Sequence, residues 1–239
     1  MNMVLYETPR KIELVGYNLF VDGKAHPRTT RNLREMKKTL LRYSEEFGNV
    51  DAYYMYRNVY KAGEMRFDIT VIPTIQFGDE YPKTHGHYHP KSEDGLAYPE
   101  IYQVLRGSAT FIMQKRNRDG SVDAMIVKAG EGDVILIPPG YGHVTVNDGS
   151  DPLVLSNLVY DRFDSLYREY AENQGAAYYY LSDGQFVQNA NYIIRRSERI
   201  DAKTLAATYG FSCKDILVEF DGQPEKFTFL EKPKLLFKA

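Results

Sequence analysis

Apolar residues and tyrosines fall into short runs through the middle of the chain, from about residue 50 to about residue 160. Runs of about four to eight residues, bounded by turn residues such as Asp119-Gly120 and Asp148-Gly149, are typical of strands. Seven runs fit this pattern, at 52–57, 67–73, 101–105, 109–114, 134–137, 143–146 and 153–159. Many short strands at this spacing predict an all-β-dominated fold, either an antiparallel sandwich or a small barrel.

A helix is predicted ahead of these strands. Asn32, with Glu35 three residues later, has the pattern of a capping box at the start of a helix. Apolar residues then recur at helical spacing until Gly48, at Leu33, Met36, Leu40, Tyr43 and Phe47. Residues 1–49 are therefore expected to form a strand-like piece and one helix, both packed on a barrel of residues 50–160.

The C-terminal residues 161–239 mix helical and strand signals. Asp164 and Gly175 mark the two ends of a short predicted helix, Asp183-Gly184 marks a hairpin turn, and residues 201–209 look helical. No long linker rich in proline, glycine or serine precedes this segment. We therefore expect a mixed C-terminal extension of the same domain rather than a second domain.

Composition narrows the possible classes of function. The 239 residues are 43% hydrophobic and 26% charged, which suits a folded globular protein. The formal net charge of −2 gives no strong field for nucleic acid or an anionic membrane, and the apolar run at 134–137 is far shorter than the roughly 20 residues of a membrane span. Cys213 is the single cysteine, and residues 1–10 lack the pattern of a secretory signal. We expect a cytoplasmic protein without a nucleic-acid or membrane partner.

Three of the five histidines are clustered, at His85, His87 and His89. His87 and His89 are two residues apart, so on a strand both side chains leave the same face. Glu100 follows closely enough to return on a neighbouring strand, and His143 lies in a later apolar run. Three imidazoles and one carboxylate suit a divalent first-row metal. Taken alone, the pair of histidines also fits two surface or hydrogen-bonded residues.

Two spaced motifs resemble those of the cupin superfamily. Residues 132–147 read G-x5-P-x-G-x2-H-x3-N, which matches the second cupin motif at every fixed position. Residues 87–107 read H-x-H-x10-E-x6-G, which is similar to the first motif but has a longer insertion before the glutamate and Tyr81 where the leading glycine would stand. The resemblance implies a cupin barrel, which is a jelly-roll-like double-stranded β-helix.

Within the cupins, the chain resembles the archaeal-type glucose-6-phosphate isomerases. The likeness is carried by T-x-G-H-x-H in residues 84–89 and E-x-Y in residues 100–102, together with Thr70 and the tyrosine-bearing residues 53–56. It covers roughly residues 50–160. It implies a metal-dependent interconversion of glucose 6-phosphate and fructose 6-phosphate, which is a step of glycolysis and gluconeogenesis, and it implies a homodimer.

The same resemblance assigns roles to particular residues. It implies one divalent ion per subunit, iron by resemblance with manganese, nickel, cobalt or zinc as alternatives, held by His87, His89, Glu100 and His143. Glu100 is also the implied catalytic residue. The implied substrate contacts are Thr70, Thr84, Gly86, Tyr102, Tyr53 and Tyr160. His85 is expected to be a pocket or surface residue, and residues 161–167 contain no histidine, whereas shorter family members carry one there.

Other functions remain open at this point. The same set of metal ligands would serve a cupin dioxygenase or decarboxylase, or a non-catalytic sugar-phosphate-binding cupin. Thr84, Gly86 and Tyr102 can donate hydrogen bonds to a phosphate group, and this favours the isomerase over the dioxygenase. The sequence is also compatible with mannose 6-phosphate as the substrate. It is compatible with two mechanisms, proton transfer through an enediolate and a hydride shift.

Overall fold

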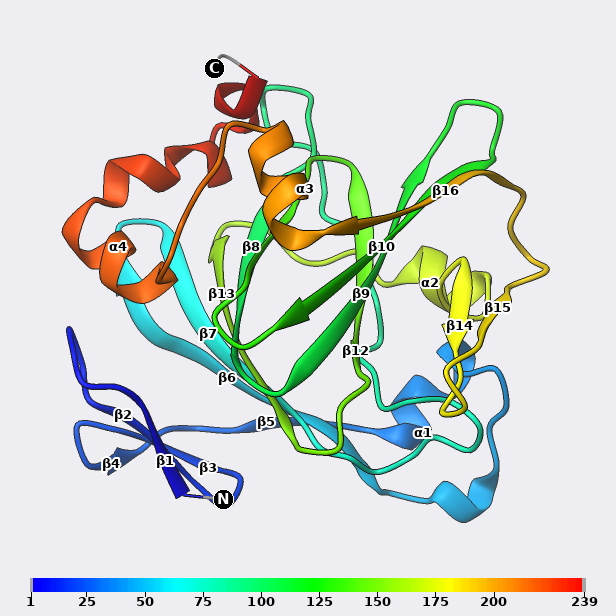
Figure 1. Ribbon diagram of the computed structural model, residues 1–239, viewed down its shortest axis with the longest axis horizontal. Coiled ribbons are helices and arrows are strands. Elements are labelled where there is room, and N and C mark those ends of the chain that lie inside the picture. Colours follow the sequence, from blue (N-terminus) through cyan, green and yellow to red (C-terminus); the bar gives the residue numbers. More distant parts are fainter. Residues whose placement is uncertain (1, 238–239) are drawn as a thin grey trace.

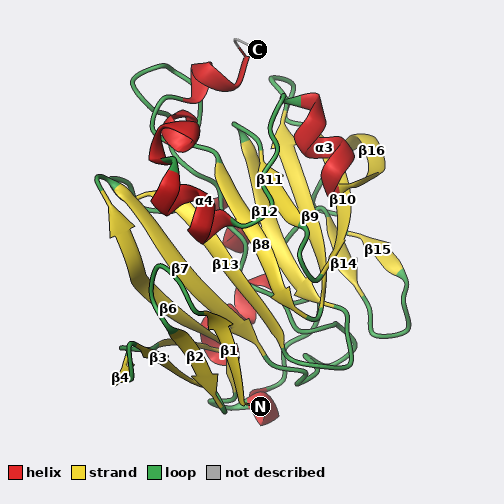
Figure 2. Ribbon diagram, turned by 60° about the vertical axis from the view of Figure 1, so that its left-hand side comes forward, coloured by secondary structure: helices red, strands yellow, loops and turns green. Residues whose placement is uncertain are grey.

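Two facing β-sheets form the centre of the computed structural model, which describes residues 2–237 (Figure 1). The larger sheet has six strands, in the spatial order β11 (Val134–Ile137), β8 (Glu100–Arg106), β13 (Leu153–Tyr160), β7 (Met65–Ile72), β6 (Asp51–Ala62) and β5 (Thr29–Asn32). The smaller sheet has four, in the order β12 (Tyr141–Asn147), β9 (Ser108–Arg116), β10 (Val122–Gly130) and β16 (Ile194–Asp201). Figure 2 shows the strands of both layers. The predicted all-β-dominated fold with a cupin barrel is confirmed.

Each of the seven predicted runs overlaps a strand of the two sheets, and three strands of these sheets, β5, β10 and β16, lie outside those runs. β10 carries Asp123 and Lys128 within an otherwise buried run, so its sequence does not alternate cleanly. β16 has the sequence IRRSERID and is largely exposed. It is a strand because its backbone pairs in parallel with β10. The pairing runs from Val122 opposite Ile194 to Lys128 opposite Asp201. Backbone pairing of this kind leaves no hydrophobic pattern in the sequence.

The six-stranded sheet is buried on both faces, and this determines where its side chains point. Along β7, Phe67 and Ile69 face outward into an apolar cluster, whereas Asp68 and Thr70 face inward and line a cavity. Because side chains alternate along a strand, a shift of one residue would exchange the two sets. The apolar outer face therefore fixes which polar residues enter the barrel.

The N-terminal meander and the C-terminal helices cover this outer face together. The meander consists of β1 (Asn2–Tyr6), β2 (Ile12–Val15), β3 (Asn18–Val21) and β4 (Lys24–Ala25), and the C-terminal part consists of α4 (Ile216–Gly222) and the 3-10 turns Pro224–Leu230 and Pro233–Phe237. Both contribute to the apolar cluster of β7, and they lie on the same side of the barrel in Figure 1. Gln103 on β8 anchors the C-terminal part, because its Nε2 donates to Lys214 O at 2.8 Å and its Oε1 accepts from Ile216 N at 3.0 Å.

The predicted N-terminal helix is confirmed only in its first turn, α1 (Leu33–Met36), where Asn32 and Glu35 form the expected capping box. The chain then continues in two 3-10 turns, Lys37–Thr39 and Glu45–Phe47. A buried ion pair between Lys83 and Glu80 accounts for the early end. Lys83 Nζ donates to Thr39 O at 3.0 Å, and Glu80 Oε2 accepts from Leu41 N at 2.7 Å. These backbone groups are therefore held outside a helix.

The C-terminal extension contains the predicted hairpin, β14 (Tyr178–Tyr180) and β15 (Phe186–Gln188), and the predicted helix α3 (Ala202–Thr208), which is capped by Asp201. The short helix α2 (Arg168–Glu172) is also present, but Asp164 does not cap it. Its N-cap is Tyr167, which makes no capping hydrogen bond through its side chain.

Within residues 2–237, no helix is both long enough and apolar enough to cross a membrane.

Candidate metal centre and its cavity

A cavity of about 350 Å³ opens inside the barrel, against the inner face of the six-stranded sheet. It brings together all six predicted substrate contacts, Tyr53, Thr70, Thr84, Gly86, Tyr102 and Tyr160. Three of the four predicted metal ligands also line it, His87, His89 and Glu100. The motif residues that are far apart in the sequence therefore meet at one site.

The two motif histidines lie on an extended segment that pairs with β12. His87 and His143 are bonded to each other through their backbones, with N···O distances of 3.3 Å and 3.0 Å. The next residue, Tyr88, points the other way and packs against Gly142. This alternation sends the side chains of His87 and His89 to the same side, as the two-residue spacing predicts.

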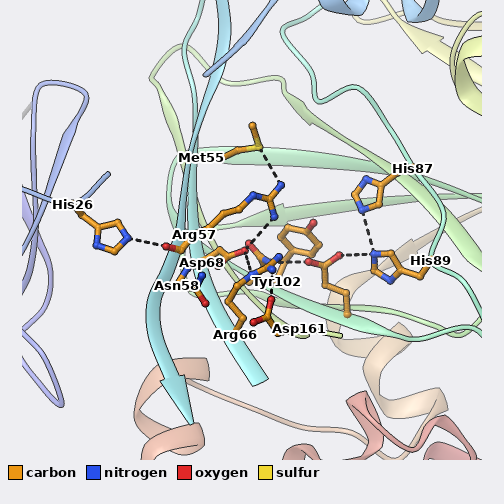
Figure 3. A network of polar contacts seen from close by, with 12 residues as sticks. His26, Met55, Arg57, Asn58, Arg66, Asp68, His87, His89, Tyr102 and Asp161 are labelled. Carbon is orange, nitrogen blue, oxygen red and sulfur yellow. Dashed lines mark hydrogen bonds and ion pairs between the residues drawn. The ribbon is translucent and has the colours of Figure 1, made fainter. Parts of the chain in front are cut away.

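The nitrogen and oxygen atoms of the predicted ligands converge. His87 Nε2 lies 3.2 Å from His89 Nε2, and Glu100 Oε2 lies 3.4 Å from His89 Nε2 and 3.5 Å from His143 Nε2. Ligand atoms of His87, His89 and Glu100 all lie within 4.8 Å of one another. His143 is outside that mutual distance and joins the group through Glu100. Figure 3 shows His87 and His89 together, with Tyr102 nearby.

The protonation of the group suits a cation. His89 Nδ1 lies 2.9 Å from the carbonyl oxygen of Tyr98, so this nitrogen carries the hydrogen and Nε2 presents its lone pair to the cluster. Burial lowers the pKa of His89 to about 4 and lowers the pKa of His87 and His143 well below the usual value. The three imidazoles are therefore neutral at pH 7, the form in which histidine binds metals.

Glu100 provides the test of whether a metal fits. Among the described residues, its buried Oε2 atom has no hydrogen-bond partner, although it faces two imidazole nitrogens. An unpaired buried acceptor costs about 1–3 kcal/mol. Burial raises the pKa of the Glu100 carboxyl to about 8, so its charged form needs a compensating positive charge. Three neutral nitrogens around an unpaired carboxylate oxygen fit a divalent cation.

Tyr102 lies at this cluster. It follows Glu100 by two residues on β8 and faces the same way, and its hydroxyl oxygen lies 3.1 Å from His143 Nε2. Burial raises the pKa of Tyr102 well above 10, so the hydroxyl stays neutral. The side chain is thus positioned to act on the same part of a ligand as Glu100.

The remaining predicted contacts line other walls of the cavity. Thr84 Oγ1 accepts a hydrogen bond from Thr145 N at 3.0 Å, so its own hydrogen remains available to donate. The Tyr53 hydroxyl lies 3.4 Å from His85 N. Tyr160 packs against Tyr98, with ring centroids 5.1 Å apart. His85 itself is buried against Tyr167 and is not part of the close metal-type cluster.

Four charged residues of the cavity wall were not predicted as site residues, Arg57, Arg66, Asp68 and Asp164. Arg66 Nε donates to Asp68 Oδ2 at 2.9 Å, whereas Arg57 Nη1 is 3.7 Å from the same oxygen (Figure 3). Alternation gives a usable signal for two of them, because Arg66 and Asp68 share the parity of Thr70 on β7. Arg57 precedes Asn58, whose φ of 57° accompanies a break in the pairing of β6 with β7, and no motif marks it.

Comparisons with known proteins agree with the motifs. The family model described as Glucose-6-phosphate isomerase (GPI) matches residues 28–195. A glucose-6-phosphate isomerase of Thermococcus onnurineus (strain NA1) is 33% identical over 94 residues, which are 39% of this chain and 46% of that protein. A putative glucose-6-phosphate isomerase 1 of Rhizobium meliloti (strain 1021) is 29% identical over 159 residues, 65% of this chain and 68% of that protein. The chain spans about half the length of the first of these relatives.

One solved structure that matches part of this chain is the oxalate decarboxylase of Lactobacillus farciminis in its formate complex. The TM-score is 0.35 at 22% sequence identity, and the match covers 48% of this chain and 30% of that chain.

Gly86 allows a test of how closely the cavity wall is packed. An alanine Cβ at this position would lie 2.5 Å from Tyr170 Cδ1 and 2.6 Å from Val144 Cγ2, and φ is +84°. Gly120 has φ +85° but nothing within 4 Å of its Cβ position, so it is a matched control for the backbone cost alone. We expect Gly86→Ala to lower the free energy of unfolding by about 1–3 kcal/mol more than Gly120→Ala does, measured by urea denaturation. Equal losses would contradict the packing described.

Proposed function

The chain belongs to the glucose-6-phosphate isomerase family, and from this we propose that it interconverts glucose 6-phosphate and fructose 6-phosphate. The observation that carries the proposal is one cavity in which a buried carboxylate and neutral imidazoles meet hydroxyl and guanidinium donors. The family match favours this activity over a dioxygenase, a decarboxylase or a non-catalytic binding protein. The reaction would serve glycolysis or gluconeogenesis. We place it in the cytoplasm because a chain whose single cysteine is Cys213 forms no intrachain disulfide.

We assign the phosphate to the part of the cavity lined by Tyr53, Thr70, Thr84 and Gly86. A hydroxyl or backbone N–H group that donates to a dianion forms a charge-assisted hydrogen bond, which is stronger than a neutral one. Thr84 supports this assignment because its hydroxyl hydrogen is available to donate. Tyr160 would contact the substrate from the end of β13.

We assign the sugar carbons that react to the part of the cavity near Glu100. A divalent ion, iron or another first-row metal, would be held by His87, His89, Glu100 and His143, and when bound it would stabilise negative charge on the sugar oxygens. The neutral hydroxyl of Tyr102 can donate a hydrogen bond to one of those oxygens. Tyr102 would therefore act near the reacting carbons rather than at the phosphate.

Glu100 would move the proton between C2 and C1. Its Oε1 atom already accepts a hydrogen bond from Asn157, so Oε2 is the oxygen that can take up a proton. The same oxygen faces the histidines, so the roles of ligand and base would fall on one atom in turn. In the alternative hydride shift, Glu100 would serve as a ligand only.

The ligand assignment predicts metal contents. Alanine substitutions at His87, His89 and His143 should each remove most of the bound metal, because each removes one of four ligand side chains. His85→Ala should keep the metal, since His85 is a neighbouring buried histidine outside the close cluster. Elemental analysis of the purified variants measures this. Loss of metal in His85→Ala together with its retention in His143→Ala would overturn the assignment.

The proposed activity predicts dependence on a divalent ion without strict selection for one metal. A coupled assay for the isomerisation of fructose 6-phosphate should show loss of activity after chelation and recovery with more than one first-row ion, because three nitrogens and one oxygen do not enforce a single metal. The same assay in D2O should place deuterium in the product if a proton is transferred. Activity that persists after confirmed metal removal would contradict the metal role. Binding of fructose 6-phosphate without turnover by metal-loaded protein would favour a non-catalytic binding protein.

We also propose a homodimer, in line with the family resemblance. The C-terminal β16 pairs with β10, which leaves β16 itself as an edge of the four-stranded sheet, and β5 and β11 are the edge strands of the six-stranded sheet. Unpaired strand edges favour association with a second copy. Light scattering across a dilution series should give twice the chain mass of 27.5 kDa. The monomer mass at every concentration would mean that the chain covers its own edges.

A further inference from the structure

The two oxygens of the Glu100 carboxylate have different surroundings. Oε1 lies 2.7 Å from Asn157 Nδ2, whereas Oε2 faces the nitrogens of His89 and His143 at 3.4 Å and 3.5 Å. Glu100 and Asn157 are only 3% and 6% exposed, so water does not compete for this bond. The contact joins residues 57 positions apart in the sequence.

The sheet fixes the position of Asn157. It lies on β13, which pairs with β7 on one side and with β8 on the other, and its register partners are Asp68 and Tyr102. Leu158, the next residue, points into the outer apolar cluster. Asn157 therefore points into the cavity, within diagonal reach of Glu100 on the neighbouring strand. The amide is held by two strand ladders rather than by a mobile loop.

An asparagine amide suits this place chemically. The terminal torsion of a glutamate is broad, so the carboxylate could turn either oxygen toward the histidines or share both. A hydrogen bond from Nδ2 fixes Oε1 and leaves Oε2 as the oxygen that faces the cluster. A neutral donor does this without cancelling the negative charge, whereas a lysine or arginine at the same place would form an ion pair with the carboxylate.

We propose that Asn157 is a positioning residue that orients the Glu100 carboxylate so that a single oxygen, Oε2, serves the bound cation and the substrate. The proposal rests on the proposed function for the roles of Glu100, but the orientation itself can be measured through metal binding alone. Partners that orient a ligand typically change metal affinity 10–100-fold when they are removed.

The test measures the affinity of the metal-free protein for Co²⁺ by calorimetric titration and records the visible spectrum of the Co²⁺-loaded protein. Asn157→Leu has nearly the same shape without the donor, and Asn157→Ala removes the side chain. Both should bind Co²⁺ about 10–100-fold more weakly than the wild type, with an altered spectrum. In the isomerase assay, kcat should fall while KM for fructose 6-phosphate changes little. Unchanged affinity and spectrum in both variants would overturn the proposal.

Gln103→Ala is the matched control. Gln103 is also a buried amide of the six-stranded sheet, but it bonds the C-terminal segment on the opposite face. The substitution Gln103→Ala should lower the midpoint temperature of thermal unfolding and leave the Co²⁺ affinity unchanged. A loss of affinity in Gln103→Ala equal to that of the Asn157 variants would mean that general destabilisation explains both, and the proposal would fail.

A double-mutant cycle with Glu100→Gln shows whether Asn157 acts through Glu100. In the Glu100→Gln background, Asn157→Leu should cause no further loss of Co²⁺ affinity, because the carboxylate that it orients is gone. An additional loss of the same size as in the wild type would overturn the proposal. Wild-type protein that binds Co²⁺ but does not isomerise the sugar phosphate would refute the proposed function and leave the affinity test of Asn157 decisive. Wild-type protein that binds no Co²⁺ would refute both.

Discussion

The polar residues of the cavity depend on the burial of both faces of the six-stranded sheet. Phe67, Ile69 and Leu158 are fully buried on its outer face, between the N-terminal meander and the C-terminal helices. A one-residue slip of a strand would move these side chains into the polar cavity, so the outer packing holds the register. The same register brings Asp68 and Asn157 inside, where burial of a polar group is unfavourable without partners. Packing on one face therefore determines the chemistry on the other.

Electrostatics explain why the inner face favours a cation. Burial stabilises the neutral forms of His87 and His143, and it opposes ionisation of Glu100. The hydrogen bond from Asn157 offsets part of the cost of the Glu100 charge, but it reaches only one carboxylate oxygen. A positive ion between the other oxygen and the imidazole lone pairs would make the charged form favourable. The cluster is therefore most stable as a set of ligands when an ion is bound.

The sequence predicted those features of the site and the fold that are set by residues close together in the chain. The parity of His87 and His89 is a property of extended backbone, and the capping box of Asn32 lies within one turn, so both could be predicted from neighbouring residues. The end of α1 could not, because the buried pair of Glu80 and Lys83 is distant in the sequence. Asn157 was missed for a similar reason. Its contact with Glu100 arises from the register of β13 against β8, and no motif records that register.

Residues 161–167 show how this chain differs from the shorter members of the family it resembles. Where those members carry a histidine, this segment has aromatic side chains: Phe163 stacks on Tyr98 with ring centroids 4.8 Å apart, and Tyr167 lies 5.5 Å from the ring of His87. Both rings line the cavity beside the histidines, so they add apolar surface next to the predicted metal ligands. No residue from 161 to 167 is a histidine. Proton transfer in this chain would therefore rely on Glu100 itself, and that makes the orientation of its one free oxygen more important than it would be beside a second proton carrier.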